Sequence, residues 1–181
     1  MEKLVTCKIV SATQLTDDFL LEFNRYQETK QVWYVEDGAY KIKDDYFIDD
    51  WSTERKVQII QELRRCVCGG GVVVAAWKQK QLVGFGNLES ERFGSDEQYL
   101  ELPYLHVSND ARGMGIGKKL FAVCCYEAKR LEGKKLYIAA HPSIESQNFY
   151  RTVGCLPVPA EEVNENIFKR EPLDIQLEKT L

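Results

Sequence analysis

The residues best suited to chemistry in this sequence lie within residues 104–120, where a strand-like run leads into a glycine-rich turn. Glycine recurs at positions 113, 115 and 117, so three Cβ atoms are missing and an anion can lie against the backbone. The helix expected to start here offers unpaired N–H groups and the positive end of its dipole, and Lys118 adds charge. The stretch therefore predicts a phosphate-binding cradle. The alternative is a turn that only lets a helix pack closely against a sheet.

The glycine spacing does not fit the common nucleotide fingerprints. A dinucleotide-binding loop reads G-x-G-x-x-G, and a P-loop has Ser or Thr after its lysine, whereas this chain has G-x-G-x-G and a second lysine. The stretch resembles motif A of the GNAT superfamily of N-acetyltransferases, [QR]-x-x-G-x-[GA], with Arg112, Gly115 and Gly117 at its defining positions. The resemblance implies that the loop binds the pyrophosphate of acetyl-CoA, which would be the co-substrate.

The same resemblance implies which residues hold acetyl-CoA. The backbone of the preceding strand would bind the acetyl and pantetheine groups through Leu105 and Val107, and His106 is included with them. Alternation turns the His106 side chain away from its neighbours, however, and a strand histidine is more often structural. The loop residues expected to contact the cofactor are Arg112, Gly113, Met114, Gly115, Ile116, Gly117 and Lys118.

A second stretch, residues 143–155, resembles the family signature N-x-x-A-x-x-x-Y-x-x-x-G-F. Tyr150 and Gly154 match it, whereas Ser143, Ser146 and Cys155 replace Asn, Ala and Phe. In the family this tyrosine lies close to the CoA sulfur and can serve as general acid, which implies that role for Tyr150. The alternative is an aromatic residue that packs in the core. Further cofactor contacts are expected from Ser143, Ser146 and Asn148.

Acetyl transfer to an amine also needs a base, because a primary amine with a pKa of about 10 is protonated at neutral pH. Glu101 lies four residues before Leu105, as the general-base glutamate does in those GNAT members that have one. Its leucine neighbours favour a raised pKa, which suits a base. The alternative is a solvated carboxylate on the outer face of the strand.

The elements that must position these residues follow from apolar periodicity. Strands are expected over residues 3–10, 71–77, 81–88, 99–107, 135–140 and 173–177. Helices are expected from Thr13 or Thr16, from Trp51 to Gly69, from Ile116 to Gly133, and over residues 143–152, whereas residues 26–50 look irregular and 89–98 form a polar connection. This order resembles the GNAT fold, a mixed α+β (α/β) fold with a mostly antiparallel sheet flanked by helices. We expect residues 1–181 to form a single N-acetyltransferase domain.

The segment from Trp33 to Trp51 is rich in both aromatic and acidic residues and falls where GNAT proteins build the acceptor pocket. Aromatic faces and carboxylates together favour a cation, so Trp33, Tyr34 and Tyr40 are expected to contact a cationic amine. The alternative is a solvated acidic loop with buried aromatic residues.

Composition limits the remaining choices. The chain has 44% hydrophobic and 29% charged residues and a net charge of −4, which is typical of a folded soluble protein and disfavours nucleic acid as a partner. No apolar run is long enough for a membrane span and no signal-peptide core is present, so a cytoplasmic protein is expected. Six cysteines lack zinc-ligand spacing, and no metal is expected.

The sequence therefore predicts an acetyl-CoA-dependent N-acetyltransferase that acts by direct attack in a ternary complex, with a small cationic amine as acceptor. The alternatives are a protein or peptide N-acetyltransferase and a non-catalytic acyl-CoA-binding module. A Rossmann-type dinucleotide protein is disfavoured by the glycine spacing. The resemblance to the family also allows a homodimer.

Overall fold

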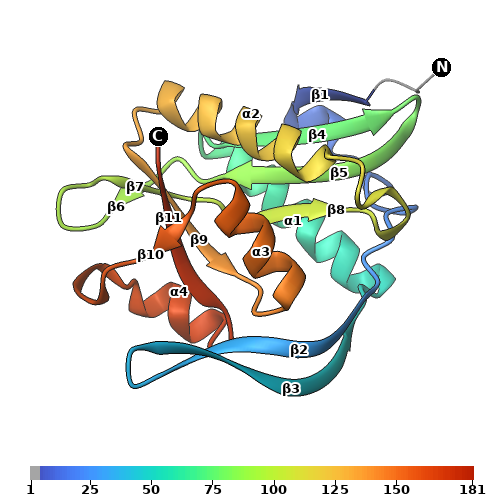
Figure 1. Ribbon diagram of the computed structural model, residues 1–181. Helices are drawn as coiled ribbons and strands as arrows, with labels where there is room; N and C mark the ends of the chain where they lie inside the picture. The colour runs from blue at the N-terminus through green and yellow to red at the C-terminus, as the bar shows by residue number, and fades with distance from the viewer. Residues whose placement is uncertain (1–4) are drawn as a thin grey trace.

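The computed structural model describes residues 5–181 as a divided sheet with helices on both faces (Figure 1). One part is an antiparallel sheet in the order β1 (Val5–Val10), β4 (Val72–Lys78), β5 (Gln81–Leu88), β8 (Tyr104–Val107). The other has the order β10 (Leu156–Pro157), β11 (Ile175–Thr180), β9 (Lys135–Ala140), β7 (Tyr99–Glu101), β6 (Arg92–Phe93). Only β7 and β9 pair in parallel among these strands. The predicted mixed, mostly antiparallel α+β fold is confirmed.

Two helices cover one face of the divided sheet and a third covers the other. In Figure 1, α2 (Ile116–Arg130) and α3 (Ile144–Thr152) cross the front, whereas α1 (Thr53–Cys68) lies behind. The buried stripe of α1 includes Ile60 and Leu63, and that of α2 includes Leu120, as the apolar spacing predicts. Two large hydrophobic clusters result, one on each face of the sheet, and a smaller third cluster surrounds Tyr99 and Tyr137.

The chain changes sheets between β7 and β8, where the sequence predicted one continuous strand. Leu102 still donates its N–H to the carbonyl oxygen of Tyr137 in β9, at 3.0 Å. Pro103 follows and has no N–H to continue the ladder. From Tyr104 onward the chain pairs with β5 instead. The strands β8 and β9 therefore part at Pro103, which prepares the site described below.

Residues 27–49 form a hairpin, and the prediction of an irregular segment here was wrong. β2 (Gln27–Glu36) and β3 (Ala39–Asp49) pair around Asp37-Gly38. Both turn residues have positive φ, 52° and 74°, as a type I′ turn requires. The Asp-Gly pair was the signal that the sequence analysis overlooked. In Figure 1 the hairpin runs along the lower edge of the molecule.

The helix predicted from Thr13 or Thr16 is also wrong. The segment holds one short 3₁₀ turn, Ala12–Gln14, followed by turns. Side chains compete with helical bonding here, since the Thr16 hydroxyl bonds to Asp18 and Arg64 donates to the Leu15 carbonyl oxygen. Leu15 and Phe23 are nevertheless buried, so their predicted core role is confirmed.

The short helix α4 (Glu165–Arg170) and the strands β6 and β10 escaped prediction because elements this short carry little periodic signal. The first strand was predicted from residue 3, but residues 1–4 lie outside the described part of the chain. Within residues 5–181, no helix has both the length and the apolar character needed to cross a membrane.

Gly71, at the start of β4, is packed too closely to accept a methyl group. A Cβ there would lie 2.4 Å from the carbonyl oxygen of Leu88 and 2.5 Å from Sγ of Cys66. We expect Gly71→Ala to lower the free energy of unfolding by about 2–3 kcal/mol, because overpacking displaces backbone. Gly69→Ala is the matched control in the same turn, with its nearest contact at 3.2 Å. Urea denaturation should show the smaller loss for Gly69→Ala, and equal losses would contradict the packing argument.

Candidate active site

A cavity of about 1420 Å³ lies where β8 and β9 part. β8 crosses the cavity, and different groups line the cavity at the two ends of this strand. Beyond Val107 the chain enters the glycine-rich loop, residues 112–118, which we call the cradle. Before Tyr104 the cavity is bordered by β7, by α1 and by the segment after α4. Carboxylates gather away from the cradle, where arginines accompany them. The carboxylates that line the cavity there are Glu28, Asp49, Glu62, Glu89, Glu101, Glu171 and Asp174, and the arginines are Arg25, Arg55, Arg65 and Arg170.

The cradle has the backbone geometry that an anion site needs. Gly113 and Gly115 have φ of 77° and 73°, a left-handed conformation that other residues rarely adopt. The backbone N–H groups of residues 113–118 donate to no residue in the described part of the chain. The Arg112 side chain folds back and donates from Nε to the Val107 carbonyl oxygen at 3.2 Å, which ties the loop to β8. The cradle therefore presents free N–H donors at the start of α2.

Most of the predicted cofactor residues in the loop and in β8 line the cavity. Met114 is the exception, because its side chain is exposed and its Sδ lies 3.9 Å from Nζ of Lys78. β8 is the edge strand of its sheet, so its side facing the split lacks a strand partner among residues 5–181. The predicted cofactor residues of β8 and the loop that line the cavity are Leu105, His106, Val107, Arg112, Gly113, Gly115, Ile116, Gly117 and Lys118.

His106 faces the opposite side of β8 from Leu105 and Val107. Those two pack against the cluster on the α2 face, whereas the His106 ring lies 5.0 Å from the ring of Trp51 on the α1 face. Burial, reinforced by the charge of Arg25, holds the pKa of His106 well below its usual range. The imidazole is therefore neutral near pH 7 and belongs to the aromatic wall of the cavity.

Tyr150, the predicted acid, is a buried residue of α3 that still lines the cavity. Its ring packs edge-on against Phe149 and Phe121, with centroids 5.1 and 6.2 Å away. Its hydroxyl forms no hydrogen bond to any residue of the described chain. Burial raises the pKa of Tyr150 far above its usual value, so the phenol keeps its proton near neutral pH.

Glu101, the predicted base, lines the cavity from β7 with only 15% of its side chain exposed. Burial raises the pKa of its carboxyl group, and the Arg170 guanidinium, which forms an ion pair with it, opposes that rise. The predicted burial is present, but the carboxylate already has a cationic partner.

Two of the three polar residues expected on α3 do not reach the cavity. Ser143 is fully buried as the N-cap of α3, where its Oγ accepts from the Ser146 N–H at 3.2 Å and from Gln27 at 3.1 Å. The family's asparagine is thus replaced by a helix cap, and a cofactor contact by this side chain is contradicted by its burial. Asn148 is exposed away from the cavity, whereas Ser146 lines it.

None of the predicted acceptor residues Trp33, Tyr34 and Tyr40 lines the main cavity, and their contact with an amine stays a prediction. Trp33 packs on Tyr40 and under the Arg151 guanidinium, and Tyr34 lies under Lys43. The physical reason is the hairpin, which carries these residues toward its tip. Its base lines the cavity instead, through Gln27, Glu28 and Asp49, together with Trp51 after it.

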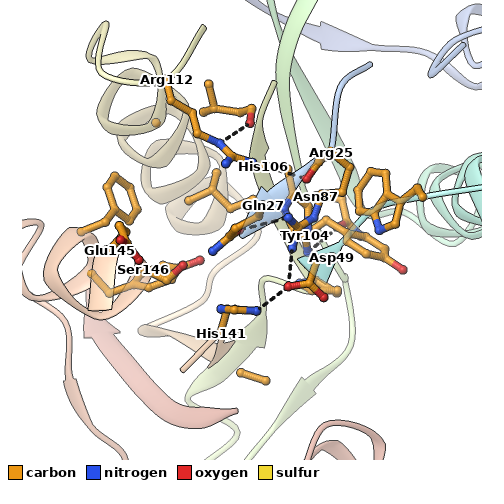
Figure 2. Close-up of a pocket in the computed structure, with 18 of the residues that line it drawn as sticks. Arg25, Gln27, Asp49, Asn87, Tyr104, His106, Arg112, His141, Glu145 and Ser146 are labelled. Carbon is orange, nitrogen blue, oxygen red and sulfur yellow. Dashed lines mark hydrogen bonds and ion pairs between the residues drawn. The ribbon is translucent and has the colours of Figure 1, made fainter. Parts of the chain in front are cut away.

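Sequence reasoning missed a charged group that Figure 2 shows converging on Asp49. Nε2 of His141 lies 2.9 Å from Oδ2 of Asp49, and Nη2 of Arg25 lies 4.0 Å from the same oxygen. Nδ1 of His141 accepts from the Ser143 N–H, so Nε2 carries the ring proton and donates to Asp49. No spacing pattern connects these residues, because they come from separate segments of the chain.

Asp174, just before β11, was missed as well. It lines the cavity, and burial, followed by repulsion from Glu171 and Asp49, raises the pKa of its carboxyl group to about 7. Arg25 opposes that rise. A solitary aspartate in the C-terminal segment offers no sequence signal.

A divided sheet with free N–H donors at one end of the split is an arrangement that suits a phosphate-bearing molecule lying along an unpaired strand. Comparison with known families identifies the protein further. The model of the acetyltransferase (GNAT) family matches residues 36–155, which is more than half of the chain. The chain belongs to the GNAT acetyltransferase family. It is accordingly an acetyl-CoA-dependent acetyltransferase, as the sequence predicted, whereas the residue-by-residue match to motif A stays a prediction.

Solved structures with the same fold cover the whole chain. A Bacillus anthracis protein described as a streptothricin acetyltransferase, solved with acetyl coenzyme A, matches at 14% identity and a TM-score of 0.70, covering 98% of this chain and 99% of its own. Nourseothricin acetyltransferase matches at 11% identity and a TM-score of 0.66, covering 97% and 98%. The PaiA N-acetyltransferase of Thermoplasma acidophilum, solved with coenzyme A, matches at 14% and 0.62, covering 98% and 99%. At these identities the likeness establishes the fold alone. No curated protein matches the chain.

Proposed function

We propose that this protein transfers the acetyl group of acetyl-CoA to a primary amine of a small cationic molecule, by direct attack in a ternary complex, and that residues 1–181 act as one N-acetyltransferase domain. One observation carries the proposal. A single cavity joins a cradle of free N–H donors to a wall where carboxylates outnumber arginines, with β8 running between them. A phosphate-bearing thioester suits the first region and an ammonium group suits the second.

The donor half of the cavity has the groups that acetyl-CoA requires. Residues 112–118 would hold the pyrophosphate through backbone N–H groups and the charge of Lys118. The unpaired edge of β8 at Leu105 and Val107 would bind the acetyl and pantetheine groups by main-chain hydrogen bonds. Tyr150 would protonate the departing thiolate, which its free, un-ionised hydroxyl supports.

The acceptor half favours a cation. Its carboxylates attract an ammonium group, and Tyr104 offers an aromatic ring beside them. Trp51 is already stacked on Phe23 and lies under the Arg25 guanidinium. The named substrates of two structural neighbours, streptothricin and nourseothricin, agree with an amine-bearing small molecule. The base of the hairpin and the segment after α4 line the cavity together, which suits a small acceptor better than a protein chain. A carboxylate on this side must take the ammonium proton, and Glu101 is the residue that the sequence predicts for this step.

A set of acceptor amines that differ in net charge tests this proposal. Free thiol released from acetyl-CoA would be measured with streptothricin, spermidine, lysine, glutamate and a basic peptide at equal concentrations. We expect the small cationic amines to turn over, with kcat/KM at least about tenfold above that of glutamate, because like charges disfavour an anionic amine. Faster turnover of the peptide would favour the protein acceptor. Tight binding of acetyl-CoA with no amine acetylated would favour the non-catalytic module.

A further inference from the structure

We propose that Asp174, and not Glu101, accepts the proton of the acceptor ammonium group. This inference rests on the proposed function and names a catalytic residue within it. Both carboxylates line the same cavity, so the question is which one reaches the reacting nitrogen. Three observations favour Asp174: its level beside β9, the absence of a partner for its carboxylate, and the charged groups that face it.

Strand register separates Asp174 from Glu101, and the acid Tyr150 lies within reach of the Asp174 charge. Glu101 in β7 pairs with Tyr137 of β9, whereas Ile175 in β11 pairs with Ala140, which puts Asp174 level with His141. At about 3.3 Å per residue, these two levels are about 13 Å apart along β9. α3 follows β9 and runs back along it, and Tyr150 lies in its second half (Figure 1). The charge of Asp174 adds to the rise in the pKa of Tyr150, whereas Glu101 is not among the groups that shift it. The reacting nitrogen must lie next to the thioester carbon, whose sulfur Tyr150 is proposed to protonate, so the base belongs at the Asp174 level.

The two carboxylates also differ in their partners. Glu101 forms an ion pair with Arg170, so an ammonium group that approached it would have to displace a guanidinium. The Asp174 carboxylate, which is half-buried, forms no hydrogen bond or ion pair with any residue in the described chain. Of the two candidates, Asp174 is therefore the one that is ready to accept a hydrogen bond from an ammonium group.

The charged groups that face Asp174 come from every neighbouring segment. Glu171 faces it from the end of α4 and Asp49 from β3, and both repel its negative charge, whereas Arg25 attracts it. Across the cavity is Tyr150, whose pKa is raised chiefly by burial, to which Cys155 and then Asp174 add. With a pKa of about 7, Asp174 exchanges protons readily at neutral pH, as a general base should.

The proton balance of the reaction is complete with these two residues. Asp174 takes one proton from the ammonium group, and the freed nitrogen lone pair attacks the thioester carbon. As the C–S bond breaks, its electron pair leaves with sulfur, and the thiolate takes a proton from Tyr150. The amide nitrogen loses its second proton, which restores Tyr150, and Asp174 releases its own proton to solvent. The products are an N-acetyl amine, free CoA and one proton.

Substitution of each carboxylate by its amide separates the two candidates. kcat/KM for spermidine and for streptothricin would be measured from pH 5.5 to 9 with Asp174→Asn, Glu101→Gln and, as a surface control, Glu165→Gln of α4. We expect Asp174→Asn to lower kcat/KM at least about a hundredfold. In the unmodified protein kcat/KM should fall as the pH drops below about 7, where Asp174 becomes protonated, and this acidic limb of the pH profile should be absent from Asp174→Asn. Glu101→Gln should keep that limb and lose less than about tenfold, since it removes only charge attraction.

A purely structural role for Asp174 would lower activity at all pH values and leave the limb in place. Asp174→Asn activity within about tenfold of the unmodified protein, with the limb retained, would overturn the inference and leave the proposed function intact. Loss of the limb in Glu101→Gln alone would return the role to Glu101. If neither amine is acetylated by the unmodified protein while acetyl-CoA binds, the proposed function fails, and the inference falls with it.

Discussion

Tyr150→Phe should lower kcat for acetyl transfer by about a hundredfold to ten-thousandfold, the range that removal of a general acid typically costs. The hydroxyl is available for this role because it bonds to no other residue in the described chain, and because burial keeps it protonated. Phenylalanine keeps the ring contacts with Phe121 and Phe149, so the fold and the affinity for acetyl-CoA should change little. Steady-state thiol release and calorimetry with acetyl-CoA measure the two quantities separately.

Tyr126→Phe is the matched control for this prediction, because Tyr126 is exposed on α2 and away from the cavity. It should retain full activity. A Tyr150→Phe enzyme within about threefold of the unmodified kcat would remove the tyrosine from the chemistry and leave it a packing residue, the alternative that the sequence analysis held open.

Gly115→Val should weaken acetyl-CoA binding by about a hundredfold. The left-handed backbone at Gly115 costs a residue with a side chain about 1–2 kcal/mol, so the free loop should relax out of the binding conformation, and restoring it on binding costs about tenfold in affinity for each 1.4 kcal/mol. A branched side chain at the mouth of the cradle would also keep phosphate from the free N–H groups beside it. Calorimetric titration with acetyl-CoA measures the loss directly.

The hairpin turn supplies a matched control for the cradle. Gly38 has φ of 74°, close to the 73° of Gly115, and neither has an atom within 4 Å of a built Cβ. Gly38→Val should therefore carry similar backbone strain and a similar loss of stability, with acetyl-CoA affinity unchanged. Equal affinity in the two variants would show that the cradle does not bind the cofactor.

The parts of the fold that sequence predicted are those with long apolar periodicity. The helix stripes at Ile60 and Leu120 and the central strands are where the spacing placed them. The split in the strand at Pro103 was missed because a proline signals an interruption but not the change of partner from β9 to β5. That change depends on pairing with residues far away in the sequence.

The candidate site also has one part that the sequence could predict and one part that it could not. The cradle was predictable because its glycines and its helix start are contiguous, and local backbone geometry follows from local sequence. The acceptor side was not, since Asp49, His141 and Asp174 come together only through the tertiary fold. Trp33, Tyr34 and Tyr40 were placed there on composition and on the resemblance to the family, and neither gives the length of the hairpin that carries them away.

The central claim is that one cavity brings acetyl-CoA and a cationic amine together for direct transfer. The most direct test follows the carbonyl carbon of ¹³C-acetyl-CoA by NMR, with the protein and with spermidine or streptothricin as acceptor. We expect the thioester resonance to be replaced by that of an N-acetyl amide, with no decay when the amine is omitted. A thioester signal that persists with either amine, under conditions where calorimetry shows saturation with acetyl-CoA, would contradict the claim.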